Sequence, residues 1–252
     1  MKDHLAVPLW MKGWCLNMEV FAMDISVNSM AESYERMLDW VPDEKKNRLQ
    51  RFLRKEDALR GLGGEVLVRW LACDRLRLAN DQLCFARLQH GKPFIEGYPE
   101  LQFNVSHAGK WVLCAIDVEP LGVDIEEIRP IDFGVGRICF SEQEFAELMQ
   151  LPEKERLSYF YELWTLKESF AKADGRGLNL PLKKVTFSAG QAGGVIHTDG
   201  WDSPFRYFKQ YSIEAGYKAA VAASHERFAD TVHFISCTDI QLSSLKSERE
   251  QL

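Results

Sequence analysis

Apolar and polar residues alternate along residues 122–126, and this alternation predicts a β-strand. Because every second side chain of a strand points to the same face, Val123 and Ile125 would face a core while Asp124 and Glu126 face the other side. Two carboxylates in an apolar setting repel each other and lose hydration, and a bound cation would relieve both effects. A solvated acidic edge strand would give the same pattern without a metal.

A helix is predicted over residues 155–173, where apolar residues recur at spacings of three and four. These residues are Leu157, Phe160, Tyr161, Trp164 and Ala171. Glu168 continues this apolar stripe, and Lys172 follows it by four residues on the same face. The glycines within residues 174–177 would end the helix. An acid on an apolar stripe points to a metal or phosphate partner, although Glu168 and Lys172 could also form an ordinary surface pair.

Two further segments have clear local signals. Residues 18–23 are predicted to form a first strand, and residues 1–17 a poorly ordered extension, too short in its apolar run to span a bilayer. Translation beginning at Met18 is an alternative. Ser141 and Glu144 have the spacing of a capping box, which predicts a helix that begins directly after Ser141.

The chain also hints at an internal duplication. Residues 105–116 align with residues 212–223, and each segment places Ala-Gly at a turn before a small or apolar strand. Hairpins with glycine turns are common, so this similarity is weak by itself.

Composition narrows the classes of function. The formal net charge of −6 argues against non-specific nucleic-acid binding, which requires a basic surface, and 46% hydrophobic residues is ordinary for a globular protein. The six cysteines have no C-x-x-C pair and no metal-site spacing, so we expect buried thiols in a reducing cytoplasm. These residues are Cys15, Cys73, Cys84, Cys114, Cys139 and Cys237.

Several motifs in a fixed order resemble the 4′-phosphopantetheinyl transferases, specifically their surfactin-synthetase-activating (Sfp-type) branch. The similarity extends from about residue 18 to about residue 238. The central motifs are G-V-D-I-E at 122–126, F-S-x-x-E at 140–144 and W-x-x-K-E-S-x-x-K at 164–172, preceded by matching pieces at 51–60, 67–69, 91–93 and 103–107.

The resemblance implies a reaction. Enzymes of this family use coenzyme A and Mg²⁺ to move the phosphopantetheine arm onto a serine of an apo carrier protein, and they release 3′,5′-ADP. Asp124, Glu126 and Glu168 match the family's metal ligands. Glu168, directly or through a metal-bound water, is the favoured general base. Lys172 matches a lysine near the pyrophosphate, where it could stabilise charge or protonate the leaving group. Mn²⁺ could replace Mg²⁺.

The resemblance also implies coenzyme A contacts from Lys45, Arg48, Lys92, Ser106 and His107. Lys45 and Arg48 would hold phosphate groups, Lys92 would lie beside the adenine and ribose, and His107 would lie near the 3′-phosphate. Without the resemblance, the cations of residues 45–48 would be interpreted as a solvated helix face.

The fold implied is α+β, a pseudo-dimer of two similar halves, each a small, mainly antiparallel sheet packed on a long helix. We expect halves at 18–120 and 121–238, followed by a polar tail at 239–252, with the active site in the cleft between the halves. Because one chain could build this cleft alone, we expect a monomer.

Carrier docking is expected near Phe140, Phe145 and Leu148, because the family receives its carrier protein in this region. Packing of Phe145, Leu148 and Met149 into the core is an equally good interpretation. The carrier could belong to peptide, polyketide or fatty-acid synthesis. We expect no nucleic-acid and no membrane partner.

Two other classes of function stay open at this point. Asp124 and Glu126 could serve a metal-dependent nuclease or phosphohydrolase, which would need neither coenzyme A nor a carrier. A non-catalytic relative could bind coenzyme A or carrier proteins as a scaffold, although it would not need Asp124, Glu126, Glu168 and Lys172 together.

Overall fold

A computed structural model describes residues 18–30, 33–187, 195–199 and 203–240. The extension expected at residues 1–17 lies outside the described residues, as does the polar tail beyond Ile240. Within the described part, no helix is both long enough and apolar enough to cross a membrane.

The first sheet has four strands in the order β11-β1-β5-β4. All neighbouring strands are antiparallel except β1 and β11, which are parallel. The strands are β1 (Glu19–Asp24), β4 (Gln102–Ala108), β5 (Trp111–Asp117) and β11 (Val232–Ile235). A separate hairpin is formed by β2 (Phe85–Arg87) and β3 (Pro93–Ile95). The first strand expected at residues 18–23 is thus confirmed as β1.

The second sheet has five strands in the order β6-β10-β9-β8-β7, all antiparallel to their neighbours. The strands are β6 (Leu121–Glu127), β7 (Thr186–Phe187), β8 (Val195–Asp199), β9 (Tyr207–Tyr211) and β10 (Tyr217–Ala223). β6 contains the strand predicted at residues 122–126.

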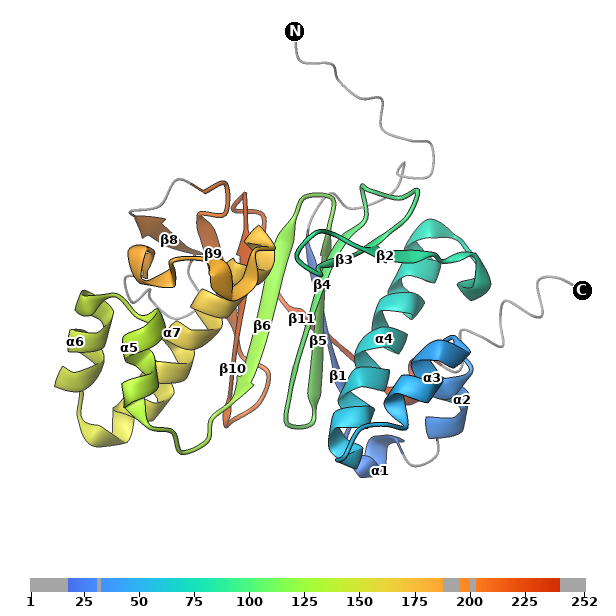
Figure 1. Ribbon diagram of the computed structural model, residues 1–252, viewed down its shortest axis with the longest axis horizontal. Helices are drawn as coiled ribbons and strands as arrows, with labels where there is room; N and C mark the ends of the chain where they lie inside the picture. The colour runs from blue at the N-terminus through green and yellow to red at the C-terminus, as the bar shows by residue number, and fades with distance from the viewer. Residues whose placement is uncertain (1–17, 31–32, 188–194, 200–202, 241–252) are drawn as a thin grey trace, which may run out of the picture.

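One long helix covers each sheet, α4 (Lys55–Leu76) in the first half and α7 (Glu153–Asp174) in the second (Figure 1). The predicted helix at 155–173 is confirmed as α7, which ends at the left-handed Gly175. The short helices are α1 (Val27–Met30), α2 (Tyr34–Leu38), α3 (Asp43–Leu49), α5 (Gly136–Cys139) and α6 (Glu142–Gln150). Single 3₁₀ turns lie at Asn80–Gln82, Phe133–Val135, Gly177–Asn179 and Leu182–Lys184.

The two halves repeat one topology, which confirms the expected α+β pseudo-dimer. The order β1-β5-β4 in one sheet corresponds to β6-β10-β9 in the other, and each long helix lies between the corresponding strands in the sequence. The alignment made from sequence is wrong in register, however. It pairs Val112, which packs toward α4, with Ala219, which faces the opposite sheet. The reason is that residues 212–216 form a loop, whereas residues 105–108 belong to β4.

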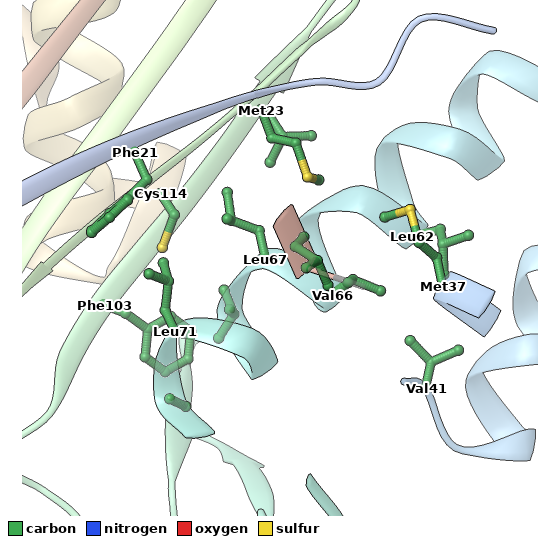
Figure 2. Close-up of a cluster of buried hydrophobic side chains, with 14 of the residues drawn as sticks. Phe21, Met23, Met37, Val41, Leu62, Val66, Leu67, Leu71, Phe103 and Cys114 are labelled. Atoms are coloured by element: carbon green, nitrogen blue, oxygen red, sulfur yellow. The ribbon is translucent and has the colours of Figure 1, made fainter. Parts of the chain in front are cut away.

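Three apolar cores hold these layers together. One lies between α4 and the first sheet, where Leu67 and Leu71 of the helix point toward Phe21 and Cys114 of the strands (Figure 2). A second lies between α7 and the second sheet. The third joins the two sheets face to face and contains Val123 and Ile125, as their alternation predicts, so Asp124 and Glu126 face α7.

The C-terminal end of the described chain returns to the first half. β11 pairs with β1, and Cys237 and Ile240 are buried in the core beneath α4. Residues 232–240 therefore belong spatially to the first half rather than to the second half or a tail. Of the cysteines expected to be buried, Cys84 is exposed and Cys73 is half-buried, while Cys114, Cys139 and Cys237 are buried.

Candidate active site

The site lies where the edge strands of the two sheets meet. β4 is the last strand of the first sheet and β6 the first of the second, and the two lie side by side (Figure 1). The side-chain oxygen of Asn104 in β4 accepts a hydrogen bond from the backbone N–H of Val123 in β6, at 2.9 Å. This bond fixes one half against the other beside the predicted acidic residues.

Asp124 lies at the centre of the site and is only 3% exposed. Its Oδ1 accepts hydrogen bonds from Ser106 Oγ of β4 at 2.8 Å and from Lys172 Nζ of α7 at 2.6 Å. Lys172 Nζ also donates to Ser106 Oγ at 2.7 Å. Three residues that the sequence separates by up to 66 positions therefore form one contact, with contributions from both halves.

Gly122 allows the helix to lie directly on the strand. A Cβ atom at this position would lie 2.1 Å from the carbonyl oxygen of Ser169 and 2.3 Å from the backbone nitrogen of Ala173. No side chain fits there, so the α7 backbone approaches β6 closely. This approach brings the last turns of α7, with Glu168 and Lys172, over Asp124.

The three predicted metal ligands share one electrostatic environment. Burial raises the pKa of Asp124, while the ammonium of Lys172 opposes the shift. Burial, then the charge of Asp124, raises the pKa of Glu126 to about 7, although its Oε1 accepts a hydrogen bond from Trp164 Nε1 at 3.2 Å. The pKa of Glu168 is raised by burial and then by Asp124. A cation would stabilise all three charged carboxylates.

The residues fit a hard cation in part. Asp124 Oδ2 is buried and has no hydrogen-bond partner among the described residues, so one carboxylate oxygen is available as a ligand. In the described part of the chain, however, no three Asp, Glu, His or Cys side chains converge closely enough to hold one ion. Mg²⁺ needs only one or two carboxylates when substrate phosphates and water complete its octahedron. The donor set therefore suits Mg²⁺ bound together with a phosphate substrate.

Ser106 and His107, both expected to contact coenzyme A, lie at this site. Ser106 belongs to the contact described above. The side chain of His107 reaches the surface, yet the protein packed around its ring lowers the pKa of the imidazole, and the positive charges of Lys172 and Arg60 lower it further. Lys172 and Arg60 thus place two cations near the end of β4, where a phosphate group could bind, and Asp57, the partner of Arg60, offsets part of their charge.

Lys92 takes a role that the sequence did not predict. Its Nζ donates to the carbonyl oxygen of Leu121 at 2.9 Å and to that of Ala173 at 3.2 Å. Lys92 follows the β2–β3 turn of the first half, whereas both acceptors belong to the second half. Burial lowers the pKa of this ammonium to about 8. Lys92 therefore joins the halves at the ends of α7 and β6.

The other two expected coenzyme A residues lie on α3, on the first half. Lys45 Nζ pairs with Glu65 of α4 at 3.2 Å, and Arg48 is exposed. No contact among the described residues joins either cation to Asp124.

The helix predicted after Ser141 is confirmed as α6, with the full capping box. Of the three residues expected to dock a carrier, Phe140 and Leu148 are buried in the core of the second half, and Phe145 is half-buried. Leu148 therefore follows the core interpretation and Phe145 follows it in part, whereas Met149, also expected in the core, is exposed. The exposed large apolar side chains of this region are instead Val135, Ile138 and Met149, of which Ile138 is 78% exposed.

Sequence reasoning missed three polar roles at the site. Trp164 was noted as an apolar stripe residue and as the first position of the W-x-x-K-E motif, yet it also donates to Glu126. Asn104 was noted only as part of a motif, yet it joins β4 to β6. Arg60 contributes positive charge near His107 and donates to the carbonyl oxygen of Gly109 at 3.0 Å. The signal was the same for all three residues: Arg60, Asn104 and Trp164 each lie in a segment that matches the family, at 51–60, 103–107 and 164–172.

Comparison with known proteins gives matches over most of the chain. Residues 28–119 match a family model described as 4′-phosphopantetheinyl transferase, N-terminal, and residues 120–222 match one described as the 4′-phosphopantetheinyl transferase superfamily. The 4′-phosphopantetheinyl transferase Sfp of Bacillus subtilis is 37% identical over 224 residues, which cover 88% of this chain and 100% of the relative.

Two other relatives show the breadth of the similarity. The 4′-phosphopantetheinyl transferase gsp of Aneurinibacillus migulanus is 33% identical over 81% of this chain and 84% of its own length. The L-aminoadipate-semialdehyde dehydrogenase-phosphopantetheinyl transferase of Xenopus laevis is 35% identical over 58% of this chain and 53% of its own.

Proposed function

Because this chain belongs to the 4′-phosphopantetheinyl transferase family, in its Sfp-type branch, we propose that it transfers the 4′-phosphopantetheine arm of coenzyme A to a serine of an apo carrier protein and releases 3′,5′-ADP. The observation that carries this proposal is the contact of Asp124, Ser106 and Lys172 at the junction of the halves. A buried carboxylate with one unpartnered oxygen lies there beside an ammonium and a hydroxyl.

Asp124, Glu126 and Glu168 would hold the Mg²⁺, or Mn²⁺ in its place, once they draw closer together than they lie in the described structure. Their raised pKa values and the unpartnered Oδ2 of Asp124 support this assignment. When bound, such an ion neutralises charge on a pyrophosphate and polarises the phosphorus under attack.

The cations around the site would bind the phosphates of coenzyme A. Lys172 is close enough to Asp124 to pair with a pyrophosphate oxygen at the same place, and its charge would stabilise the leaving phosphate. His107 and Arg60 would receive another phosphate at the end of β4. Lys45 and Arg48 of α3 would hold further phosphate oxygens, and Lys92 would line the junction that it joins.

Glu168 would accept the proton of the attacking serine. Its raised pKa makes the carboxylate a stronger base than an exposed glutamate. Glu126 is less suited to this role because Trp164 already donates to it.

The carrier protein would approach over the segment from Phe133 to Gln150. Phe145 is half-buried there, and the exposed side chains of Val135, Ile138 and Met149 offer an apolar surface beside the helix that carries Glu168. Because one chain supplies both sides of the junction, we propose that it works as a monomer. All five described cysteines are free thiols, which supports the reducing cytoplasm as its location.

The proposal is tested by the intact mass of an apo carrier protein incubated with this chain, coenzyme A and Mg²⁺. We expect a gain of one phosphopantetheine group that is lost with EDTA and with Asp124→Ala. Coenzyme A binding without any gain, across peptidyl, polyketide and fatty-acid carriers, would favour a scaffold. Metal-dependent cleavage of a phosphodiester without coenzyme A would favour a hydrolase.

A further inference from the structure

A fully buried ion pair lies beneath the active site, on the far side of α7. Glu144 of α6 and Lys167 of α7 are each 0% exposed, and their Oε2 and Nζ atoms lie 2.7 Å apart. Lys167 belongs to the W-x-x-K-E motif, yet neither residue has a part in the reaction proposed above.

The hydrogen bonds of this pair are complete. Lys167 Nζ donates to Glu144, to the carbonyl oxygen of Leu182 at 3.0 Å and to that of Val185. Glu144 Oε2 accepts from the backbone N–H of Ser141 at 2.7 Å, and its Oε1 accepts from that of Phe187 at 2.8 Å. Every donor of the ammonium and both oxygens of the carboxylate are therefore satisfied.

These bonds connect three separate segments. Glu144 belongs to the capping box that begins α6, Lys167 belongs to the middle of α7, and the remaining partners lie along residues 182–187, which lead into and form β7. The pair thus fixes the start of α6 and the path of the chain after α7 to one point on α7.

The pair is better explained by the positions that its hydrogen bonds fix than by a contribution to the free energy of unfolding. Removing two charges from water costs much of what their attraction returns, and well-packed apolar residues often replace such a pair without loss of stability. An apolar contact is non-directional. The bonds of this pair, by contrast, fix six residues at hydrogen-bond distance: the pair itself and its four backbone partners, Ser141, Leu182, Val185 and Phe187. A packed core would not need that specification.

Glu168 directly follows Lys167 in the sequence. Lys172, one turn after Glu168 and on the same face of α7, bonds Asp124. Successive helical residues are about 100° apart around the helix axis, so Lys167 points toward α6 and β7 while Glu168 lies on the face of α7 that is turned to Asp124. Fixing Lys167 therefore fixes the rotation of α7 that determines where Glu168 points. The same bonds fix α6, on the segment where a carrier would dock.

We propose that the Glu144–Lys167 pair positions Glu168 for the transfer reaction by setting the rotation of α7 and the placement of α6 against it. Both are positioning residues, since neither touches the reacting groups. This inference rests on the proposed transferase function.

The test compares the variants Lys167→Met and Lys167→Met/Glu144→Gln with wild type at a temperature well below all melting temperatures. Lys167→Met leaves a buried carboxylate without its cation, so its Tm should fall. The double variant removes both charges and should recover most of that loss. Its kcat should nevertheless fall at least about tenfold, because small displacements of catalytic groups are costly. Its KM for coenzyme A should stay within about twofold, because the cations that bind phosphates are not touched.

The matched control is Arg75→Met/Glu19→Gln, which removes the pair that joins α4 to β1 in the other half. We expect its kcat to equal that of wild type. A double Lys167/Glu144 variant with recovered Tm and wild-type kcat would overturn the inference and leave the pair a purely structural role. Should Lys167→Met not fold, the kcat of Glu144→Gln alone, which preserves the shape of the side chain, decides in the same way. Absence of transfer by wild type would instead count against the proposed function.

Discussion

α4 and α7 both span 22 residues, and each covers three strands in corresponding order, but the strands beneath them carry different residues. β1 presents Phe21 and Met23 to α4, and both are buried in an apolar core. β6 presents Asp124 and Glu126 to α7 instead. The layer between helix and strand is therefore apolar in the first half, whereas it contains the carboxylates of the candidate site in the second half.

An ion pair links the last turns of each long helix to the first strand of its half. Arg75 of α4 pairs with Glu19 of β1 at 2.6 Å, and Lys172 of α7 pairs with Asp124 of β6 at the same distance. Both members of the first pair are partly exposed, whereas Asp124 is buried and also bonds Ser106 of the other half. The same helix-to-strand link is thus a surface contact in one half and part of the site in the other.

The largest expected effect comes from breaking the link in the second half. Lys172→Met removes the cation beside Asp124, and we expect kcat for arm transfer to fall about 10²-fold or more, because a charge that stabilises the transition state is lost. Arg75→Met is the matched change in the first half and should leave kcat unchanged. Equal losses in both variants would show that the link matters only for folding.

The next largest difference is expected between two glycines, one in each half, that allow a helix and a strand to pack closely. Gly122→Ala would place a Cβ 2.1 Å from the backbone of α7, and we expect a loss of about 3 kcal/mol in the free energy of unfolding, together with lower activity. Gly64→Ala in α4 would meet Val105 at 3.3 Å, and its gain in helix propensity of about 1 kcal/mol offsets that contact. Urea unfolding of both variants checks the difference, and a tolerated Gly122→Ala would contradict the packing of α7 on β6.

The contribution of Lys92, which joins the two halves, to the free energy of unfolding should depend on pH. The folded pKa of Lys92, about 8, lies below the unfolded value of 10.5, so between these pH values the unfolded chain binds more protons. Stability from this residue should therefore rise as the pH rises from 8 to 10.5. The unfolding free energy of wild type minus that of Lys92→Met should grow over this window. A difference that shrinks would mean that the two carbonyl bonds outweigh the burial of the ammonium.

The smallest effect concerns the helix ends. α7 ends at Gly175 with φ of 85°, whereas α4 ends at Arg77 with φ of 54°. A residue with a Cβ atom costs about 1–2 kcal/mol in this left-handed region. Glycine avoids that cost, but it also gives the unfolded chain more conformational entropy, which cancels part of the gain in stability. We expect Arg77→Gly to stabilise the protein by about 0.5 kcal/mol and Gly175→Ala to destabilise it by about 1 kcal/mol. Thermal unfolding measures both, and opposite signs would refute this account of the caps.

Much of the second half could be predicted from local sequence. The alternation around Asp124, the stripe of α7 and the capping box of Ser141 and Glu144 are short-range patterns, and all three elements formed as expected. The pseudo-dimer came from the resemblance, since the repeat itself was aligned in the wrong register. A one-residue shift reverses every side chain of a strand. Because β5 and most of β10 are buried on both faces, their residues do not alternate between apolar and polar, and the hydrophobic pattern does not fix the shift.

Long-range contacts were beyond local patterns. Lys92 donates to two backbone carbonyls. Because every residue has a backbone carbonyl, the sequence does not indicate which of them a side chain will contact. Trp164 and Lys167 belong to a recognised motif, yet their partners Glu126 and Glu144 lie on other elements. The return of β11 to β1 likewise depends on pairing across about 210 residues, which no periodicity encodes.

The most direct test of the account compares one carboxylate from each half. The rate of arm transfer from coenzyme A to an apo carrier, followed by intact mass, would be measured for wild type, Asp124→Asn and Glu19→Gln. We expect no gain of mass with Asp124→Asn and a wild-type rate with Glu19→Gln. Transfer by Asp124→Asn at a rate near that of wild type would contradict the claim that the chemistry resides where α7 crosses β6.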